Sequence, residues 1–269
     1  MAEQERVFVV IDPAAESQPA LARGVITAGL REPHAELLLH VALDGSAVDT
    51  RADNAYLYRD RAWFEALFAP VEAAGLDYRC QVTWTSEWAE AILRAARRFQ
   101  ADLLLLPLAP RAGSRRALLS EGMWQVLRNA HCPVLMARPE AKPRRAVVLA
   151  ALKAQSGDPR YVELNRKIAG RARWMAERYG AALHVVNAYR DQDDYPDRAR
   201  LLELAGVPNE QVHVEDGPPD RVIAQVAATV GADIVVVGTL ARQGLAAVMR
   251  GNTSERVIAA LPQDVMTLN

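Results

Sequence analysis

Glycine and threonine residues that could bind a phosphate follow a buried-strand pattern near the end of the chain, in residues 238–257. They come after the unbroken β-branched apolar run of residues 234–237, which is typical of a parallel strand covered on both faces. Asn252 and Glu255 then have the spacing of a helix N-cap and its reciprocal partner. Such a helix start offers free backbone N–H groups and the positive end of the helix dipole to an anion. We therefore predict a nucleotide- or anion-binding site at Gly238, Thr239, Gly251, Asn252 and Thr253.

This loop resembles the phosphate loop of the universal stress proteins, which reads glycine, two residues, glycine, nine residues, glycine and then serine or threonine. Gly238 and Gly251 stand at the first and third glycines. Ala241 replaces the second glycine, where its methyl group narrows the approach to the backbone, and Asn252 replaces the hydroxyl residue. The Gly-Asn-Thr sequence is most similar to the E-type tandem members, and the resemblance implies ATP as the candidate ligand. The alternative is that the glycines only let the chain turn.

An internal repeat determines the predicted architecture. Residues 101–106 match residues 232–237 at an offset of 131 (232 − 101), and the helical apolar stripe of residues 91–99 matches residues 222–230 at the same offset. Agreement of this length indicates two homologous halves rather than a solenoid of many repeats.

We predict two domains, 1–140 with a degenerate loop and 141–269 with a partial glycine loop, joined by the polar, proline-bearing segment 138–145. The predicted strands are 6–12, 36–42, 79–85, 102–107 and 133–137 in the first half, and 146–152, 182–188, 211–215, 232–238 and 264–268 in the second. The predicted helices include one opened by Pro19, one around Trp63 and Phe64, one over residues 88–99, and one capped by Asp158 and ended by Gly180. This alternation predicts an α/β fold of two tandem doubly wound parallel sheets. The resemblance implies the universal stress protein form of that fold, which is similar to the adenine nucleotide alpha-hydrolases.

Neither half carries the full set of residues that the resemblance associates with nucleotide binding, an aspartate after the first strand together with the glycine loop. The first half has Asp12, but Pro107 and Ser120 stand where the second half has its two glycines. The second half keeps those glycines and offers Ala151 or Leu152 in place of the aspartate. We therefore expect the first half to act as a scaffold or partner surface.

Three further groups of residues have two interpretations each. Asp12 either contacts a ribose or a metal phosphate or forms an Asx turn, and we favour the turn. The arginines of residues 111–116 either attract an anion or belong to a solvated loop, which we favour. Trp84 and Trp88 either line a small apolar pocket or pack beneath a loop, and packing is the simpler expectation.

Composition excludes several classes of protein. The net charge is -1 and the arginines are scattered among as many acids, which argues against a nucleic-acid partner. No apolar run approaches the roughly 18 residues of a membrane helix and the N-terminus has no signal-peptide layout, so we expect no membrane partner and a cytoplasmic protein. Cys80 and Cys132 are expected to be reduced, buried thiols. The five histidines lack metal-ligand spacing, which predicts no metal site, and His40 and His184 are expected to form hydrogen bonds within strands.

No catalytic residues are predicted, because neither a Gly-x-Ser-x-Gly elbow nor a Gly-x4-Gly-Lys-[Ser/Thr] loop is present. We prefer a non-enzymatic stress-response protein of the tandem universal stress type, with at most a weak nucleotide or anion site in the second half. The alternative is an ATP-binding protein with weak ATPase activity that uses residues 238–253. The closing strands, 134–137 and 265–268, are expected to pair antiparallel as an intramolecular pseudo-dimer. A homodimer would then use another surface, near Trp63 and Phe64, and the sequence names no other protein partner.

Overall fold

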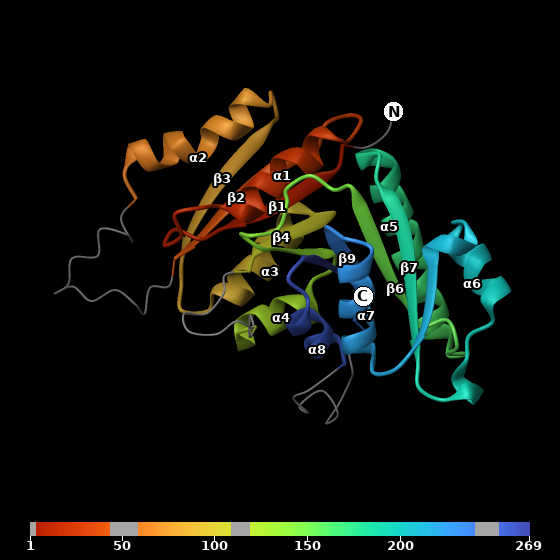
Figure 1. Cartoon of the computed structure of the whole chain (residues 1–269). Coiled ribbons are helices and arrows are strands. Elements are labelled where there is room, and N and C mark those ends of the chain that lie inside the picture. Colours follow the sequence, from red (N-terminus) through yellow and green to blue (C-terminus); the bar gives the residue numbers. More distant parts are fainter. Residues whose placement is uncertain (1–3, 44–58, 109–118, 240–252) are drawn as a thin grey trace. The chain divides into compact units, whose positions relative to one another are not determined.

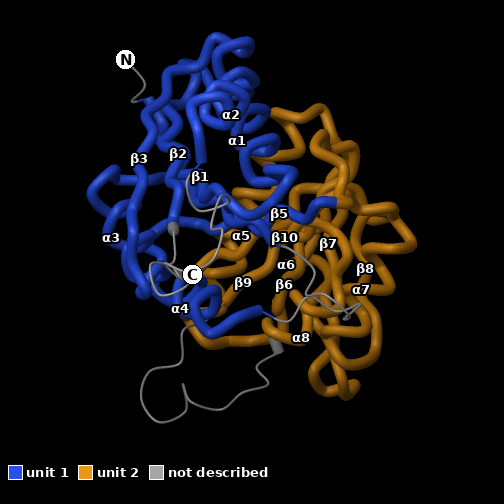
Figure 2. The backbone as a smooth tube through the Cα atoms, turned by 90° about the vertical axis from the view of Figure 1, so that its left-hand side faces the viewer, with its two compact units in different colours: residues 1–109, 119–139 blue, residues 110–118, 140–269 orange. Residues whose placement is uncertain are grey.

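A computed structural model describes residues 4–43, 59–108, 119–239 and 253–269 of the chain (Figure 1). These residues form two compact units: unit 1 holds the described residues up to Pro139, and unit 2 holds those from Glu140 onward (Figure 2). That each predicted domain, 1–140 and 141–269, folds independently stays a prediction. The pairing of the two closing strands also stays a prediction.

Unit 1 is a parallel sheet of five strands in the order β3-β2-β1-β4-β5. Its strands are β1 (Arg6–Ile11), β2 (Glu36–Leu43), β3 (Tyr78–Trp84), β4 (Leu103–Pro107) and β5 (Val134–Ala137). Its helices are α1 (Pro19–Gly29), α2 (Arg61–Ala73), α3 (Trp88–Phe99) and α4 (Glu121–Asn129). The predicted strands and the three predicted helices are confirmed. Helix α4 was not predicted, although the side chain of Ser120 caps it by accepting a hydrogen bond from the Met123 backbone N–H at 3.3 Å.

Unit 2 repeats the arrangement, with parallel strands in the order β8-β7-β6-β9-β10. Its strands are β6 (Val147–Leu152), β7 (Ala182–Tyr189), β8 (Val212–Asp216), β9 (Ile234–Gly238) and β10 (Asp264–Leu268). Its helices are α5 (Pro159–Tyr179), α6 (Arg198–Ala205), α7 (Pro219–Thr229) and α8 (Thr253–Ala260), with single 3-10 turns η2 (Gln192–Asp194) and η3 (Asn209–Gln211). Helix α5 begins and ends as predicted, because Asp158 accepts from the Arg160 backbone N–H and Gly180 adopts a left-handed φ of 62°. The two doubly wound parallel sheets confirm the predicted fold class.

The aspartate of the repeated Ala-Asp pair has the same structural role in both units. Asp102 accepts a hydrogen bond from the Arg6 backbone N–H at 2.8 Å, just as Asp233 accepts from that of Val147 at 3.0 Å. Each aspartate therefore attaches the start of its own unit's first strand to the strand beside it. Charge-assisted bonds to backbone N–H groups are stronger than neutral ones, which gives this pair of residues a reason to recur at an offset of 131 (233 − 102).

The predicted linker is anchored at both ends by buried arginine contacts. In unit 1, the guanidinium of Arg23 donates to the backbone carbonyl of Arg138 at 2.9 Å. In unit 2, the guanidinium of Arg145 lies 2.6 Å from the carboxylate of Asp264, and both side chains are fully buried. The segment is polar in sequence, yet its last residue forms part of the interior of unit 2.

The prediction for the cysteines is half wrong. Both are free thiols, as expected, but Cys80 is exposed and Cys132 is half-buried. Strand β3 is the outermost strand of unit 1, and Cys80, Val82 and Trp84 alternate along one face of it that stays exposed. An apolar strand pattern therefore did not imply burial on both faces here.

Candidate functional site

The two sheets each reverse strand order at one place, between β1 and β4 in unit 1 and between β6 and β9 in unit 2. Ligands of open α/β sheets bind beyond the carboxyl ends of the strands at such a switch point. Asp12 follows β1 and Gly238 ends β9, so these two residues lie at the places where this fold binds ligands.

The strand register corrects the predicted equivalent of Asp12. Val7 pairs with Leu103 in unit 1, and Val148 pairs with Ile234, the repeat equivalent of Leu103, in unit 2. Val7 and Val148 are thus equivalent, and the residue five positions further on is Asp12 in one unit and Lys153 in the other. The equivalent of the aspartate is therefore neither Ala151 nor Leu152. The loops before the strand differ in length, so sequence alignment placed this position one or two residues too early.

Asp12 forms the Asx turn that we favoured. One carboxylate oxygen of Asp12 accepts a hydrogen bond from the Ala14 backbone N–H at 2.9 Å. The side chain of Gln18 bonds to the backbone of Asp12 twice, donating to its carbonyl at 2.6 Å and accepting from its N–H at 3.2 Å. Arg59 donates to the carbonyl of Pro13 at 2.7 Å. These contacts give the aspartate a structural role in the turn between β1 and α1.

Lys153 is exposed at the carboxyl end of β6, and its ammonium group lies 4.3 Å from the centre of the Tyr161 ring. The backbone of Lys153 is held in place by the buried amide of Asn165, which forms hydrogen bonds with both the N–H and the carbonyl of Lys153 at 3.0 Å. The next N–H, of Ala154, donates to the buried side chain of Asn187 at 2.8 Å. The lysine side chain thus stands on a rigid loop at the switch point of unit 2.

Gly238 is a close-packing position in unit 2. A Cβ at Gly238 would lie 2.5 Å from Cδ2 and 2.7 Å from Cγ of Leu164, and 3.0 Å from Cδ1 of Ile168. Both side chains belong to α5, so the glycine lets that helix approach the sheet. A specific packing requirement therefore accounts for the first glycine of the loop without a ligand.

Thr239 already has partners within unit 2. Its backbone N–H donates to the carbonyl of Leu268 at 2.8 Å, and its hydroxyl contacts the side-chain oxygen of Asn269. The carbonyl of Gly238 accepts from the hydroxyl of Ser254 at 3.3 Å, which brings the start of α8 beside the end of β9. Among the predicted site residues, Gly238, Thr239 and the first residue of α8, Thr253, therefore lie in one region. Gly251 and Asn252 lie outside the described residues, as does the side chain of Thr253.

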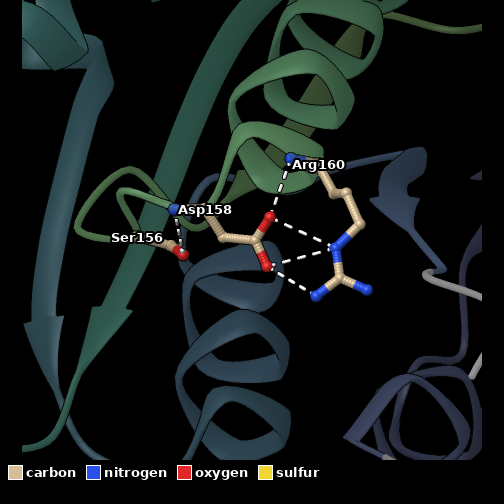
Figure 3. A network of polar contacts seen from close by, with 3 residues as sticks. All are labelled: Ser156, Asp158 and Arg160. Atoms are coloured by element: carbon tan, nitrogen blue, oxygen red, sulfur yellow. Dashed lines mark hydrogen bonds and ion pairs between the residues drawn. The ribbon is translucent and has the colours of Figure 1, made fainter.

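A network of polar contacts surrounds Asp158 at the start of α5 (Figure 3). The Asp158 carboxylate accepts from the Arg160 guanidinium at 2.6 Å, and the Asp158 N–H donates to the Ser156 hydroxyl at 3.4 Å. The hydrogen bonds from Arg160 lower the pKa of Asp158 below its ordinary value. Only the role of Asp158 as an N-cap had a sequence signal, because its pairing with Arg160 depends on side-chain conformation.

The two tryptophan candidates of unit 1 differ in their surroundings. The Trp88 ring packs on α4, since a Cβ at Gly122 would lie 2.5 Å from its Cζ2. Trp84 is 48% exposed on β3. The arginines of residues 111–116 lie outside the described residues. Packing is therefore the better interpretation for Trp88.

The expectation that His40 and His184 form hydrogen bonds is confirmed. Nε2 of the buried His40 lies 3.0 Å from the Thr83 hydroxyl, and burial lowers the pKa of His40 to about 4. Nδ1 of His184 lies 3.1 Å from Nε2 of His213. Within the described part of the chain, no three histidine, cysteine, aspartate or glutamate residues group so as to hold a metal ion.

The fold and its switch points define a tandem α/β protein of two doubly wound units, and comparison with known proteins identifies its family. The model of the universal stress protein family matches residues 4–138 and 197–269, and the chain belongs to this family. Membership supports a role in stress response. None of the described helices is long and apolar enough to cross a membrane.

Full-length relatives agree with the tandem arrangement. The chain is 25% identical to universal stress protein E of Photorhabdus laumondii, covering 100% of this chain and 96% of the relative. It is 26% identical to universal stress protein E of Escherichia coli K12, covering 100% and 95%. A crystal structure of a functionally unknown protein from Pseudomonas aeruginosa PAO1 superposes with a TM-score of 0.81 at 26% identity, covering 98% of this chain and 92% of the other. The resemblance to tandem, E-type members is therefore confirmed.

Proposed function

We propose that the chain is a non-enzymatic stress-response protein of the tandem universal stress type, whose residual nucleotide or anion affinity is weak and lies in unit 2. The proposal depends on one observation about the two equivalent switch points. Unit 1 has a carboxylate there, Asp12, whereas unit 2 has an ammonium group, Lys153. Phosphoryl transfer relies on Mg²⁺, which proteins hold through carboxylates and substrate phosphates. A lysine at this position attracts the phosphates directly and repels the metal ion.

The contacts of the predicted site residues support a weak site. The space beside Gly238 is filled by Leu164, and the backbone N–H and hydroxyl of Thr239 already have partners within unit 2. Besides Lys153, the described part of unit 2 offers an anion the start of α8, where each electrostatic contribution is worth about 0.3–1 kcal/mol when exposed. We expect ATP to bind no tighter than about millimolar, which corresponds to a free energy near −4 kcal/mol.

Isothermal titration with ATP, with and without magnesium, tests this proposal. Lys153→Ala should weaken any binding, and it should do so at least as strongly without magnesium, because the lysine contacts the anion itself. Lys142→Ala is the matched control: it removes the same charge from a lysine that is 81% exposed and lies near Asp233, just before β9 begins, at the opposite edge of the sheet. Micromolar affinity that Gly251→Val abolishes, together with phosphate release from ATP, would instead establish the alternative, a weak ATPase.

A further inference from the structure

Two histidines connect the outermost strand of unit 2 to the rest of its sheet. β8 pairs with β7 and is the last strand of the order in unit 2 (Figure 2). His213 of β8 pairs in register with Val186 of β7, so His184, two residues earlier on β7, lies on the same face as His213. Their ring centroids are 5.4 Å apart with the ring planes 26° from parallel, and Nδ1 of His184 lies 3.1 Å from Nε2 of His213. We call these two residues the histidine pair.

A hydrogen bond between two imidazoles requires one facing nitrogen to carry a proton and the other to lack one. The neutral pair meets this requirement, since each neutral ring has one donor and one acceptor nitrogen. A pair with one added proton also meets it, because the charged ring donates to the neutral one. When both rings are charged, two N–H donors and two like charges face each other at about 3 Å, and the bond is lost. The contact therefore tolerates one added proton and not two.

The groups around the histidine pair act in opposite directions. Burial, the larger cause, and the neighbouring His213 lower the pKa of His184. Burial also lowers the pKa of His213, while Glu215 on β8 raises it and Arg198 of α6 lowers it. Helix α7, which packs on both strands, carries its charged residues, Asp220 and Arg221, in its first turn, and Glu210 of η3 is exposed just before β8 begins. The surroundings thus favour the neutral pair.

We propose that the histidine pair is a proton-linked lock, which holds β8 on β7 at neutral pH and releases this edge of unit 2 on acidification. The direction follows from linkage. Both folded-state pKa values lie below the ordinary 6.5, so the opened strand binds more protons than the closed one once the pH falls below about 6.5. Above about pH 6.5 both rings are neutral in the closed and opened states, and the histidine pair stabilises the closed state in full. This stabilisation is lost as the pH falls from about 6.5 towards the lowered pKa values of the two histidines. Each histidine raises the opening equilibrium by up to about tenfold per pH unit in that window.

Release has a structural consequence for the sheet edge. Arg198 donates to the Val212 carbonyl at 3.3 Å and to the side chain of Asn209 at 2.9 Å, so α6 and η3 are attached to the start of β8. Opening of β8 would free these contacts together and expose the backbone of the eight-residue strand β7 as a new edge. The lock therefore controls access to a strand that could pair with another chain.

Hydrogen exchange with mass spectrometry on the full chain at pH 7.5 and 5.5 tests the lock, after correction for the intrinsic pH dependence of exchange. We expect the opening equilibrium of β8 peptides to rise on acidification, by up to about tenfold for each histidine per pH unit below 6.5. Peptides of β3 are the internal control, because β3 is the edge strand of unit 1. Among the described residues, the histidine that bonds to β3 is His40, which has a pKa of about 4 and stays neutral at both pH values.

The variant His184→Gln/His213→Gln isolates the protons, because glutamine donates and accepts hydrogen bonds but does not titrate in this range. We expect its β8 peptides to exchange alike at both pH values. An NMR titration of the imidazole resonances of the unmodified protein needs no variant, and it should show both histidines titrating below 6.5. The proposal is overturned if β8 responds to pH no more than β3 does, if the double variant keeps the response of the unmodified protein, or if both histidines titrate at or above 6.5.

Discussion

Replacing Gly238 with alanine tests whether this glycine is kept for packing. The new Cβ would lie 2.5 Å and 2.7 Å from two carbons of Leu164, whereas carbon atoms in contact prefer about 3.5–4.0 Å. One of these carbons is Cγ, close to the helix backbone, so a rotation of the terminal methyl groups cannot relieve the overlap. Helix α5 must shift locally by about 1 Å to restore that spacing.

The expected loss of stability follows from two opposing terms. Overpacking of a well-packed core costs about 1–3 kcal/mol. Alanine also lowers the backbone entropy of the unfolded chain, which stabilises the folded state by about 0.4–1 kcal/mol. We therefore expect Gly238→Ala to lower the free energy of unfolding of unit 2 by about 1–2 kcal/mol. Gly170→Ala is the matched control: Gly170 is exposed within the same helix and a Cβ added there would meet no atom within 4 Å, so alanine should stabilise by about 0.5–1 kcal/mol.

Denaturant unfolding followed by circular dichroism measures both changes, and hydrogen exchange of β9 and α5 peptides assigns them to unit 2, since a protein of two units need not unfold in one step. Leu164→Ala combined with Gly238→Ala should cost less than the sum of the two single changes, by about 0.5–3 kcal/mol, because the shorter side chain removes the overlap. If Gly238→Ala proves as stable as the unmodified protein, the packing explanation of this glycine is refuted.

Two further stability predictions follow from polar contacts. Asp264→Asn should destabilise unit 2 by about 3–5 kcal/mol, because it leaves the buried guanidinium of Arg145 without its counter-charge. The double variant Arg145→Met/Asp264→Leu should recover much of that loss. Equal costs for the single and double variants, measured by denaturant unfolding, would contradict this. Ser120→Ala should cost about 0.5–2 kcal/mol through loss of the α4 cap, and Ser120→Thr, which keeps a hydroxyl, should cost less. Thermal melts of the two Ser120 variants would show the difference, and identical melting temperatures would argue against the cap.

The local sequence determined most of the secondary structure. Asp158, Pro159 and Gly180 each carry a short-range backbone preference, and together they predicted the ends of α5. The apolar runs of the strands and the offset of 131 residues likewise need no tertiary information. Helix α6 was missed because its eight residues are too few to show a clear apolar periodicity, although Asp197 caps it and Gly206 ends it.

The residues at the switch points were decided by tertiary structure. Lys153 became the equivalent of Asp12 only through the pairing of β6 with β9, because loop lengths hide strand register in a linear alignment. Gly238 has the sequence of a phosphate loop, yet its neighbour is Leu164, 74 positions earlier in the chain (238 − 164).

The same distinction applies to the side chains at the edges of the two sheets. The exposure of Cys80 and the pairing of His184 with His213 depend on which strands lie outermost and which residues share a face. The sequence by itself therefore determined the elements, which follow from local preferences, their repetition, which follows from the offset of 131, and the family, which the glycine loop resembles. Only the tertiary structure decided which charges and surfaces those elements bring together, because register and helix packing are set by contacts between residues far apart in the chain.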